Sequence, residues 1–361
     1  MDTQDQHLQN RRGFLKTVGA GTLGVAGASL LSSSNTSAQT KPNVLFIAID
    51  DLNDWVGCYG GHPQAITPNI DKLASAGMLF DNAHCQAPIC NPSRASLLTG
   101  TYPSTSGLYF LGPQMRETET LQDAVTLQQY FMEHGYKSMG AGKIFHTCND
   151  GPSFHEFGGT MGGFGPRQEK KIGCPKGHPL WDWGAYPDDD ADMPDYKIAQ
   201  WAKGKLAEEH EAPFFLSVGF FRPHVPMYAP PKWFDMHPRD KVILPEASKE
   251  DMDDISQYAL DLTWGEAAPR HDYVVEIGEW EHAVQAYLAS VSFVDSCVGE
   301  VLSTLNSSKY ADNTIIVLWS DHGFHLGEKC RWGKRSLWEE STRAPLVIAG
   351  PGIEGGQRCA R

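Results

Sequence analysis

The chain has 361 residues, of which 41% are hydrophobic and 11% aromatic, enough for a large domain with a sizeable core, so a disordered protein is excluded. The 30 basic and 44 acidic side chains give a formal net charge of −14, which repels nucleic-acid phosphates and anionic membranes, and we expect no nucleic-acid partner. An anionic substrate therefore requires local positive charge, supplied by a few placed cations or by a metal ion.

Residues 1–38 are predicted to be a twin-arginine export signal. Arg11 and Arg12 precede Phe14 and a Gly- and Ala-rich apolar stretch at 18–31, and small residues at 36–38 offer a cleavage point. The stretch is shorter than the ~20 apolar residues that a membrane-spanning helix needs. We therefore expect transport by the Tat translocase to the periplasm or the exterior, and no integral membrane segment after cleavage.

Four apolar runs in the remaining chain are predicted strands. They lie at residues 44–49, 137–141, 214–220 and 314–319, and each leads into polar or charged residues. Continuous apolar runs of this length are typical of strands buried on both faces of a parallel sheet. The residues that follow them are candidate site residues, because sites in such sheets form beyond the carboxyl ends of the strands.

Helices are predicted between these strands. A helix at 126–134 closes on Gly135, and apolar residues recur every three or four positions over 281–305. Alternating strands and helices predict a doubly wound α/β fold, with a mostly parallel sheet flanked by helices. Residues 149–196 and 257–279 show no clear period, and we interpret them as loops over the site.

The densest motif lies at residues 90–100. Pro92 suits the first position of a helix, so Cys90 is expected just before a helix N-terminus, where free amides and the helix dipole stabilise an anion. The simpler alternative is a packed cysteine, and a thiolate nucleophile would need a histidine base nearby.

The run Cys90-x-Pro92-Ser93-Arg94 resembles the signature of type I sulfatases of the alkaline phosphatase superfamily, in which the cysteine becomes Cα-formylglycine. The resemblance extends from about Pro42 to Gly352 and is strongest to the iduronate 2-sulfatase-like branch. The other motifs, in family order, are Lys41-Pro42-Asn43, Asp50-Asp51, Thr67-Pro68-Asn69-Ile70-Asp71, Gly142-Lys143 with His146, the stretch at 218–226, and Ser320-Asp321-His322-Gly323.

A calcium site follows from this resemblance. Asp50, Asp51 and Asp321 offer the hard carboxylate oxygens that calcium takes, while His322 is a less usual partner for a hard cation. The resemblance implies that these four residues and residue 90, as formylglycine, hold the ion. The alternative for the Asp-Asp pair alone is a solvated loop or a helix cap.

The resemblance also implies a nucleophile and its helpers. Hydrated formylglycine at position 90 would attack sulfur, with Arg94 and His146 orienting the diol, and His146 would act as the base that releases sulfate. The mature chain would need a formylglycine-generating enzyme as a partner.

Three further residues complete the predicted site. Lys143 and Lys334 would hold the sulfate oxygens, and His224 would protonate the leaving sugar oxygen. His224 lies close to two prolines and could instead stiffen a loop, and Lys334 could exchange roles with Arg331 or Arg335.

Sulfatases of this type usually continue into a smaller antiparallel C-terminal subdomain. This chain ends at Arg361, so we expect a catalytic domain at 41–361 that is truncated, with that subdomain missing or incomplete. The leading hypothesis is an exported, calcium-dependent sulfatase acting on a sulfated carbohydrate. The alternatives are a phosphate or phosphonate ester hydrolase of the same superfamily, and a non-catalytic binder of sulfated glycans.

Overall fold

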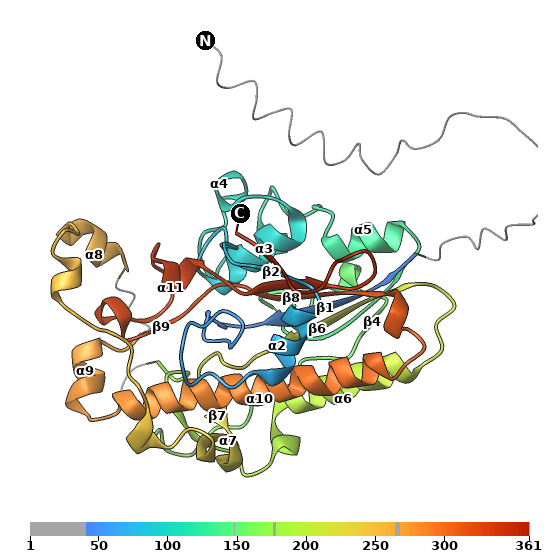
Figure 1. Ribbon diagram of the computed structural model, residues 1–361. Coiled ribbons are helices and arrows are strands. Elements are labelled where there is room, and N and C mark those ends of the chain that lie inside the picture. Colours follow the sequence, from blue (N-terminus) through green and yellow to red (C-terminus); the bar gives the residue numbers. More distant parts are fainter. Residues whose placement is uncertain (1–40, 148, 176–177, 264–267, 361) are drawn as a thin grey trace, which may run out of the picture. The chain divides into compact units, whose positions relative to one another are not determined.

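The computed structural model describes residues 41–147, 149–175, 178–263 and 268–360, so the predicted export signal at 1–38 lies outside the described residues. An eight-stranded sheet forms the centre of the described part (Figure 1). Across the sheet the strands are β12 (Gln357–Cys359), β2 (Met78–Phe80), β11 (Leu346–Ala349), β8 (Thr314–Ser320), β1 (Asn43–Ile49), β6 (Phe214–Phe220), β3 (Lys137–Gly142) and β4 (Glu156–Phe157).

The five strands from β8 to β4 are mutually parallel, whereas β11 runs antiparallel to both β8 and β2. The predicted α/β class with a mostly parallel sheet is therefore confirmed. Every residue of β1 and β6 is buried, which is the reason that their sequences are continuous apolar runs.

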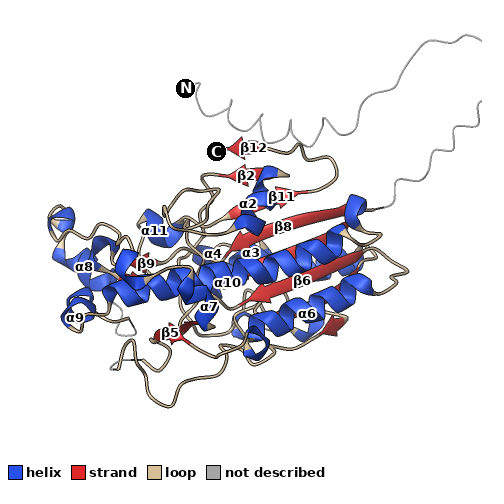
Figure 2. Cartoon of the chain, turned by 60° about the horizontal axis from the view of Figure 1, so that its bottom comes forward, coloured by secondary structure: helices blue, strands red, loops and turns tan. Residues whose placement is uncertain are grey.

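Helices cover both faces of the sheet (Figures 1 and 2). The helices longer than one turn or so are α2 (Pro68–Ser75), α3 (Cys90–Thr99), α5 (Leu127–Glu133), α6 (Pro194–Ala207), α8 (Gln257–Thr263), α9 (His271–Glu276) and α10 (Trp280–Asn306). The shorter elements are α4 (Pro103–Ser106), α7 (Pro231–Asp235), α11 (Glu339–Thr342), and the two strand pairs β5 (Trp183–Ala185) with β7 (Met227–Ala229) and β9 (His325–Leu326) with β10 (Trp332–Gly333).

Alternate side chains of β1 enter two separate apolar cores. Leu45, Ile47 and Ile49 pack with α10, α6 and α2 on one face, while Phe46 and Ala48 pack with α3 and α5 on the other. Within the described residues, α10 alone has the length and hydropathy of a membrane span, but most of that apolar stretch is buried, as expected of a core helix.

Two sequence-based predictions need correction. The sequence predicted Pro92 in the first position of a helix, but α3 begins two residues earlier, at Cys90. Pro92 is still tolerated in the first turn, because the amides there have no acceptor within the helix. The segments 149–196 and 257–279 are not simply loops, since the first contains the short strands β4 and β5 and the second contains α8 and α9. α8 was missed because it is only 7 residues long, about two turns, which is too short for a helical period to stand out in the sequence.

Candidate active site

The carboxyl ends of β1, β3, β6 and β8 bring the predicted site residues together. Ile49 of β1 is in register with Ser320 of β8 on one side and with Phe220 of β6 on the other. The residues that follow these three positions therefore lie at one edge of the sheet, as predicted. Asp50 and Asp51 follow β1, Lys143 follows β3, His224 follows β6, and Asp321 and His322 follow β8.

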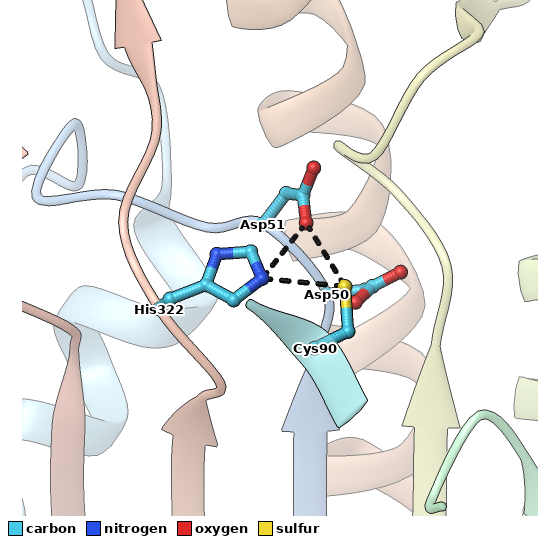
Figure 3. A group of neighbouring side chains, drawn as sticks. All are labelled: Asp50, Asp51, Cys90 and His322. Carbon is cyan, nitrogen blue, oxygen red and sulfur yellow. Dashed lines mark hydrogen bonds and ion pairs between the residues drawn. The ribbon is translucent and has the colours of Figure 1, made fainter. Parts of the chain in front are cut away.

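Cys90, the first residue of α3, faces this edge from the side (Figure 3). Its Sγ lies 3.3 Å from His322 Nε2, 3.4 Å from Lys334 Nζ and 3.9 Å from Asp51 Oδ1. Only 2% of the Cys90 surface is exposed. The thiol therefore sits at the centre of the predicted constellation and not on a neutral packing surface.

Asp51 is fixed by its backbone. Its φ angle of 63° lies in the left-handed region, which is uncommon for a residue with a side chain. The Asp51 amide donates to Asp321 Oδ1 at 3.1 Å, and its carbonyl accepts from the Tyr287 hydroxyl at 2.8 Å. Tyr287, on α10, also accepts from the Asn53 amide at 2.9 Å, so the core helix holds the loop that carries both carboxylates.

Arg94 is completely buried and ties the carboxylates to α3. Its Nε donates to Asp321 Oδ2 at 2.8 Å, and a terminal nitrogen donates to Asp50 Oδ1 at 3.2 Å. The other terminal nitrogen donates to the carbonyls of Lys143 and Ile144. In this arrangement the guanidinium fixes the positions of the carboxylates, one turn of helix away from Cys90.

Two lysines supply positive charge beside Cys90. Lys334 donates to both carboxylate oxygens of Asp51, and Lys143 donates to Asp50 Oδ2. Arg331 and Arg335, the alternatives considered for the role of Lys334, line the adjoining cavity. The geometry favours Lys334, because its Nζ is in contact with Cys90.

The three predicted histidines all point into the site. His322 Nδ1 donates to the Gly323 carbonyl at 2.9 Å, and His224 Nδ1 donates to the Val225 carbonyl at 2.6 Å. Each ring therefore turns Nε2 toward Asp51, at 3.4 Å for His322 and 3.8 Å for His224. His146 lines the same cavity, and its Nδ1 is buried with no hydrogen-bond partner among the described residues.

The local charges shift several pKa values. Burial raises the pKa of the Cys90 thiol, but Lys143, Lys334 and His322 outweigh it and hold that pKa well below its ordinary value. Burial lowers the pKa of His322, yet Asp321, Cys90 and Asp51 raise it to about 9. The site thus favours a negative charge at position 90.

The donor set fits a divalent metal ion. Asp50, Asp51, Cys90 and His322 are buried, and one potential ligand atom from each lies within 4.8 Å of the others (Figure 3). Asp321, also predicted as a ligand, is adjacent, and in this arrangement its two oxygens accept from Arg94 and from the Asp51 amide. Because Nδ1 donates to the Gly323 carbonyl, Nε2 is the nitrogen of His322 that would bind a metal ion, after losing its own proton.

A cavity of about 360 Å³ opens beside Cys90. Its wall combines the predicted cations with apolar side chains, a composition typical of small-molecule sites. Among the lining residues are Leu111, Phe164, His178, Trp181, Phe324 and Trp332. The segment at 149–196 lies over the site, as expected, and contributes His178 and Trp181 to the cavity wall. Trp183 is fully buried and packs with its ring stacked on Trp332.

Tyr287 and Leu111 are among the contributors to this region that sequence reasoning missed. Tyr287 lies within an ordinary apolar helix, and its role depends on a contact 236 positions away along the chain. Leu111 belongs to a Tyr-Phe-Leu run between Gly107 and Gly112; the exposed aromatics there were a signal that could have drawn attention.

Comparison with known proteins identifies the family to which this α/β chain belongs. The sulfatase family model matches residues 42–358, and the chain therefore belongs to the sulfatase family. A sulfatase of Formosa agariphila is 44% identical over 333 residues, covering 88% of this chain and 66% of that protein. Iduronate 2-sulfatase of Homo sapiens is 33% identical over 353 residues, covering 90% and 62%.

The fold is also shared with solved structures. A phosphonate monoester hydrolase of Agrobacterium radiobacter has a TM-score of 0.70 at 22% identity, over 89% of this chain and 71% of that one. A protein solved with its substrate D-glucosamine-2-N,6-O-disulfate has a TM-score of 0.66 at 22% identity, over 89% and 74%. The predicted family and fold are confirmed, and the chain spans less than two thirds of the length of its curated iduronate 2-sulfatase relatives.

Proposed function

We propose that this chain is the catalytic part of an exported sulfatase that hydrolyses sulfate esters of a sulfated carbohydrate, with formylglycine at position 90 and a calcium ion beside it. The observation that carries the proposal is the position of Cys90, in contact with both His322 and Lys334 and next to the Asp50-Asp51 pair. A sulfate ester is an anion, and this acidic chain concentrates its buried cations at that point.

The charges of the site agree with an anionic substrate and a bound cation. The carboxylates of Asp50, Asp51 and Asp321 form ion pairs with the cations Arg94, Lys143 and Lys334. A divalent cation binding to the carboxylates would leave the lysines without partners. Both ammonium groups would then be available for the sulfate oxygens.

The metal ion and the modified residue would each supply one part of the chemistry. Asp50, Asp51, Asp321 and His322 would hold calcium, which supplies a Lewis acid for a sulfate oxygen. Formylglycine would supply a hydrated aldehyde, whose hydroxyl is the nucleophile toward sulfur.

The chain's own residues bind the substrate and move its protons. Lys334 and Lys143 bind sulfate oxygens and stabilise the negative charge that develops as the ester bond breaks. His146, which lines the cavity beside residue 90, acts as the base that releases sulfate. His224 holds Nε2 toward the site through its Nδ1 bond to Val225 and donates a proton to the leaving sugar oxygen.

The names of several relatives support a carbohydrate substrate. Besides iduronate 2-sulfatase, they include an ulvan-active sulfatase of Formosa agariphila and a Δ4,5-hexuronate-2-O-sulfatase of Bacteroides thetaiotaomicron, each 28% identical to this chain. Residues 1–38 would direct export through the Tat translocase, which transports folded proteins, so a formylglycine-generating enzyme could act on Cys90 before export. A periplasmic or secreted enzyme would meet extracellular sulfated glycans.

The test is turnover by protein co-expressed with a formylglycine-generating enzyme. We expect calcium-dependent sulfate release from a sulfated sugar, no release by Cys90→Ala, and loss of activity in EDTA. Phosphate and phosphonate esters are tested in parallel, because the fold is shared with a phosphonate monoester hydrolase. Faster turnover of those esters than of sulfate esters would indicate a phosphate or phosphonate ester hydrolase. Glycan binding without any turnover would indicate a non-catalytic binder.

A further inference from the structure

A short loop beside the cavity is held by the residue next to Cys90. Asn91 is buried, and its side-chain amide donates to the carbonyls of Phe110 at 3.1 Å and Pro113 at 2.9 Å. The Gln114 side chain donates to the Leu111 carbonyl at 3.2 Å. Three backbone carbonyls of this loop are therefore occupied by fixed donors, and the position of the loop is tied to the start of α3.

The same loop presents consecutive apolar side chains to solvent. Tyr109 is 50% exposed, Phe110 65% and Leu111 40%, and Leu111 also lines the cavity beside Cys90. Single exposed apolar residues are ordinary on a soluble protein, but an exposed apolar patch at the edge of a cavity marks a binding surface. We call Tyr109, Phe110 and Leu111 the aromatic platform.

The charge of the chain indicates what kind of contact a sulfated polymer needs here. With a net charge of −14, the protein as a whole repels a polyanion, and Lys143 and Lys334 are required for the reacting sulfate itself. Arg331 and Arg335 also line the cavity, but the run at 109–111 contains no cation, so a sugar unit on that run is held by contacts that do not depend on charge. The C–H face of a sugar ring packing on an aromatic ring is such a contact, and it buries apolar surface from both partners.

We propose that the aromatic platform stacks against the sugar unit next to the sulfated one, so that the substrate is an oligosaccharide or polysaccharide and not a free sulfated monosaccharide. This inference rests on the proposed function, and it specifies the substrate class of the same site. The continuity of the platform with the cavity, through Leu111, places the neighbouring unit directly outside the pocket that holds the sulfate ester.

Binding can be measured separately from catalysis by affinity electrophoresis of the protein in native gels containing heparin, ulvan or ι-carrageenan. The test variant is Tyr109→Ala/Phe110→Ala. The matched control is Tyr130→Ala on α5, which removes a ring that is 54% exposed and does not line the cavity. We expect wild type and control to be retarded by at least one polymer, and the double variant to bind roughly tenfold more weakly. The retardation should persist when salt is added, because stacking is not screened.

Equal retardation of the double variant, equal loss in the control, or no retardation of wild type by any of the three polymers would overturn the proposal. A wild-type dimer that dissociates in the double variant would also overturn it, because the platform would then be an interface between two copies. Failure of the proposed function has a different signature: no sulfate release by the formylglycine-containing protein from any sulfate ester, including small aryl sulfates. If the protein releases sulfate with equal efficiency from a monosaccharide and from an oligosaccharide, the sulfatase function would stand and only the proposed role of the aromatic platform would be rejected.

Discussion

Lys334 donates from Nζ to both carboxylate oxygens of Asp51, at 2.6 Å and 2.8 Å, across 283 positions of sequence. The same Nζ lies 3.4 Å from Cys90 Sγ. One ammonium group thus joins the residue after β10, the loop after β1 and the start of α3. An ammonium group in this position would contact an anion bound beside residue 90.

Replacing Lys334 tests this assignment. We expect Lys334→Met to lower kcat for sulfate release by about 10²–10³-fold, the usual effect of removing one charge-stabilising donor in an active site. The control is Lys329→Met, which removes a lysine five positions away that pairs with Asp251. Steady-state kinetics of the two formylglycine-containing variants provide the measurement, and similar losses in both would contradict a specific role for Lys334.

Metal binding should appear as a calcium-dependent gain in stability. A ligand at 100 times its Kd adds about 2.7 kcal/mol to the free energy of unfolding, so calcium should raise the Tm of wild type. Asp50→Asn should abolish this rise, because it removes one of the buried carboxylates. Asp54→Asn is the control, since Asp54 pairs with Arg343 outside the cluster. A calcium response that survives in Asp50→Asn would exclude the assigned site.

Gly219 allows the backbone that carries Lys143 to approach β6. A Cβ at this position would lie 2.3 Å from the Lys143 carbonyl oxygen, too close for any real contact. We expect Gly219→Ala to destabilise the protein by roughly 1–3 kcal/mol and to lower turnover by displacing Lys143. The paired variant is Gly204→Ala in α6, where a Cβ meets nothing within 4 Å and should stabilise the helix by about 0.5–1 kcal/mol. Urea unfolding of both variants checks the opposite signs.

His325 is a buried neutral histidine that holds the segment carrying Lys334. Its Nε2 lies 2.9 Å from Ser336 Oγ, and Ser336 Oγ lies 2.8 Å from Ser341 Oγ. Burial, reinforced by the nearby charge of Arg331, lowers the pKa of His325 to about 3. His325 is protonated in the unfolded chain at a higher pH than in the folded protein, so its contribution to stability is lost as the pH falls.

This linkage gives a slope that can be measured. Between the ordinary histidine pKa of about 6.5 and the folded value, His325 adds about 1.4 kcal/mol of stability per unit of rising pH. Unfolding free energies from urea titrations at about pH 5 and about pH 7 should therefore differ less in His325→Gln than in wild type. Exposed His134→Gln serves as the control. An unchanged pH dependence in His325→Gln would show that this histidine is not buried neutral.

Much of the fold was predictable because β1, β6 and β8 are nearly continuous apolar runs with charged residues at their ends. The predicted strand at 214–220 matches β6, and the helix predicted at 281–305 falls within α10. Parallel register then dictates that Asp50, Lys143 and Asp321 meet, which sequence patterns alone can anticipate. The start of α3 was less predictable, because proline is acceptable at several positions of a first turn.

The surroundings of the site could not be deduced in the same way. The support of Asp51 by Tyr287 and the fixing of the Phe110 loop by Asn91 are tertiary contacts between segments without periodicity. Lys334 and not Arg335 contacts Cys90 because the chain turns at Arg335, whose φ is 74°. No residue type in that run predicts such a turn. Such backbone choices are set by packing and not by local propensity.

The most direct test of the proposed mechanism is the mass of the peptide that contains residue 90, from protein made with a formylglycine-generating enzyme. We expect the mass of an aldehyde in place of the Cys90 thiol, together with sulfate release that Cys90→Ala lacks. A folded protein that keeps an unmodified thiol under these conditions would contradict the formylglycine mechanism and leave glycan binding as the function to pursue.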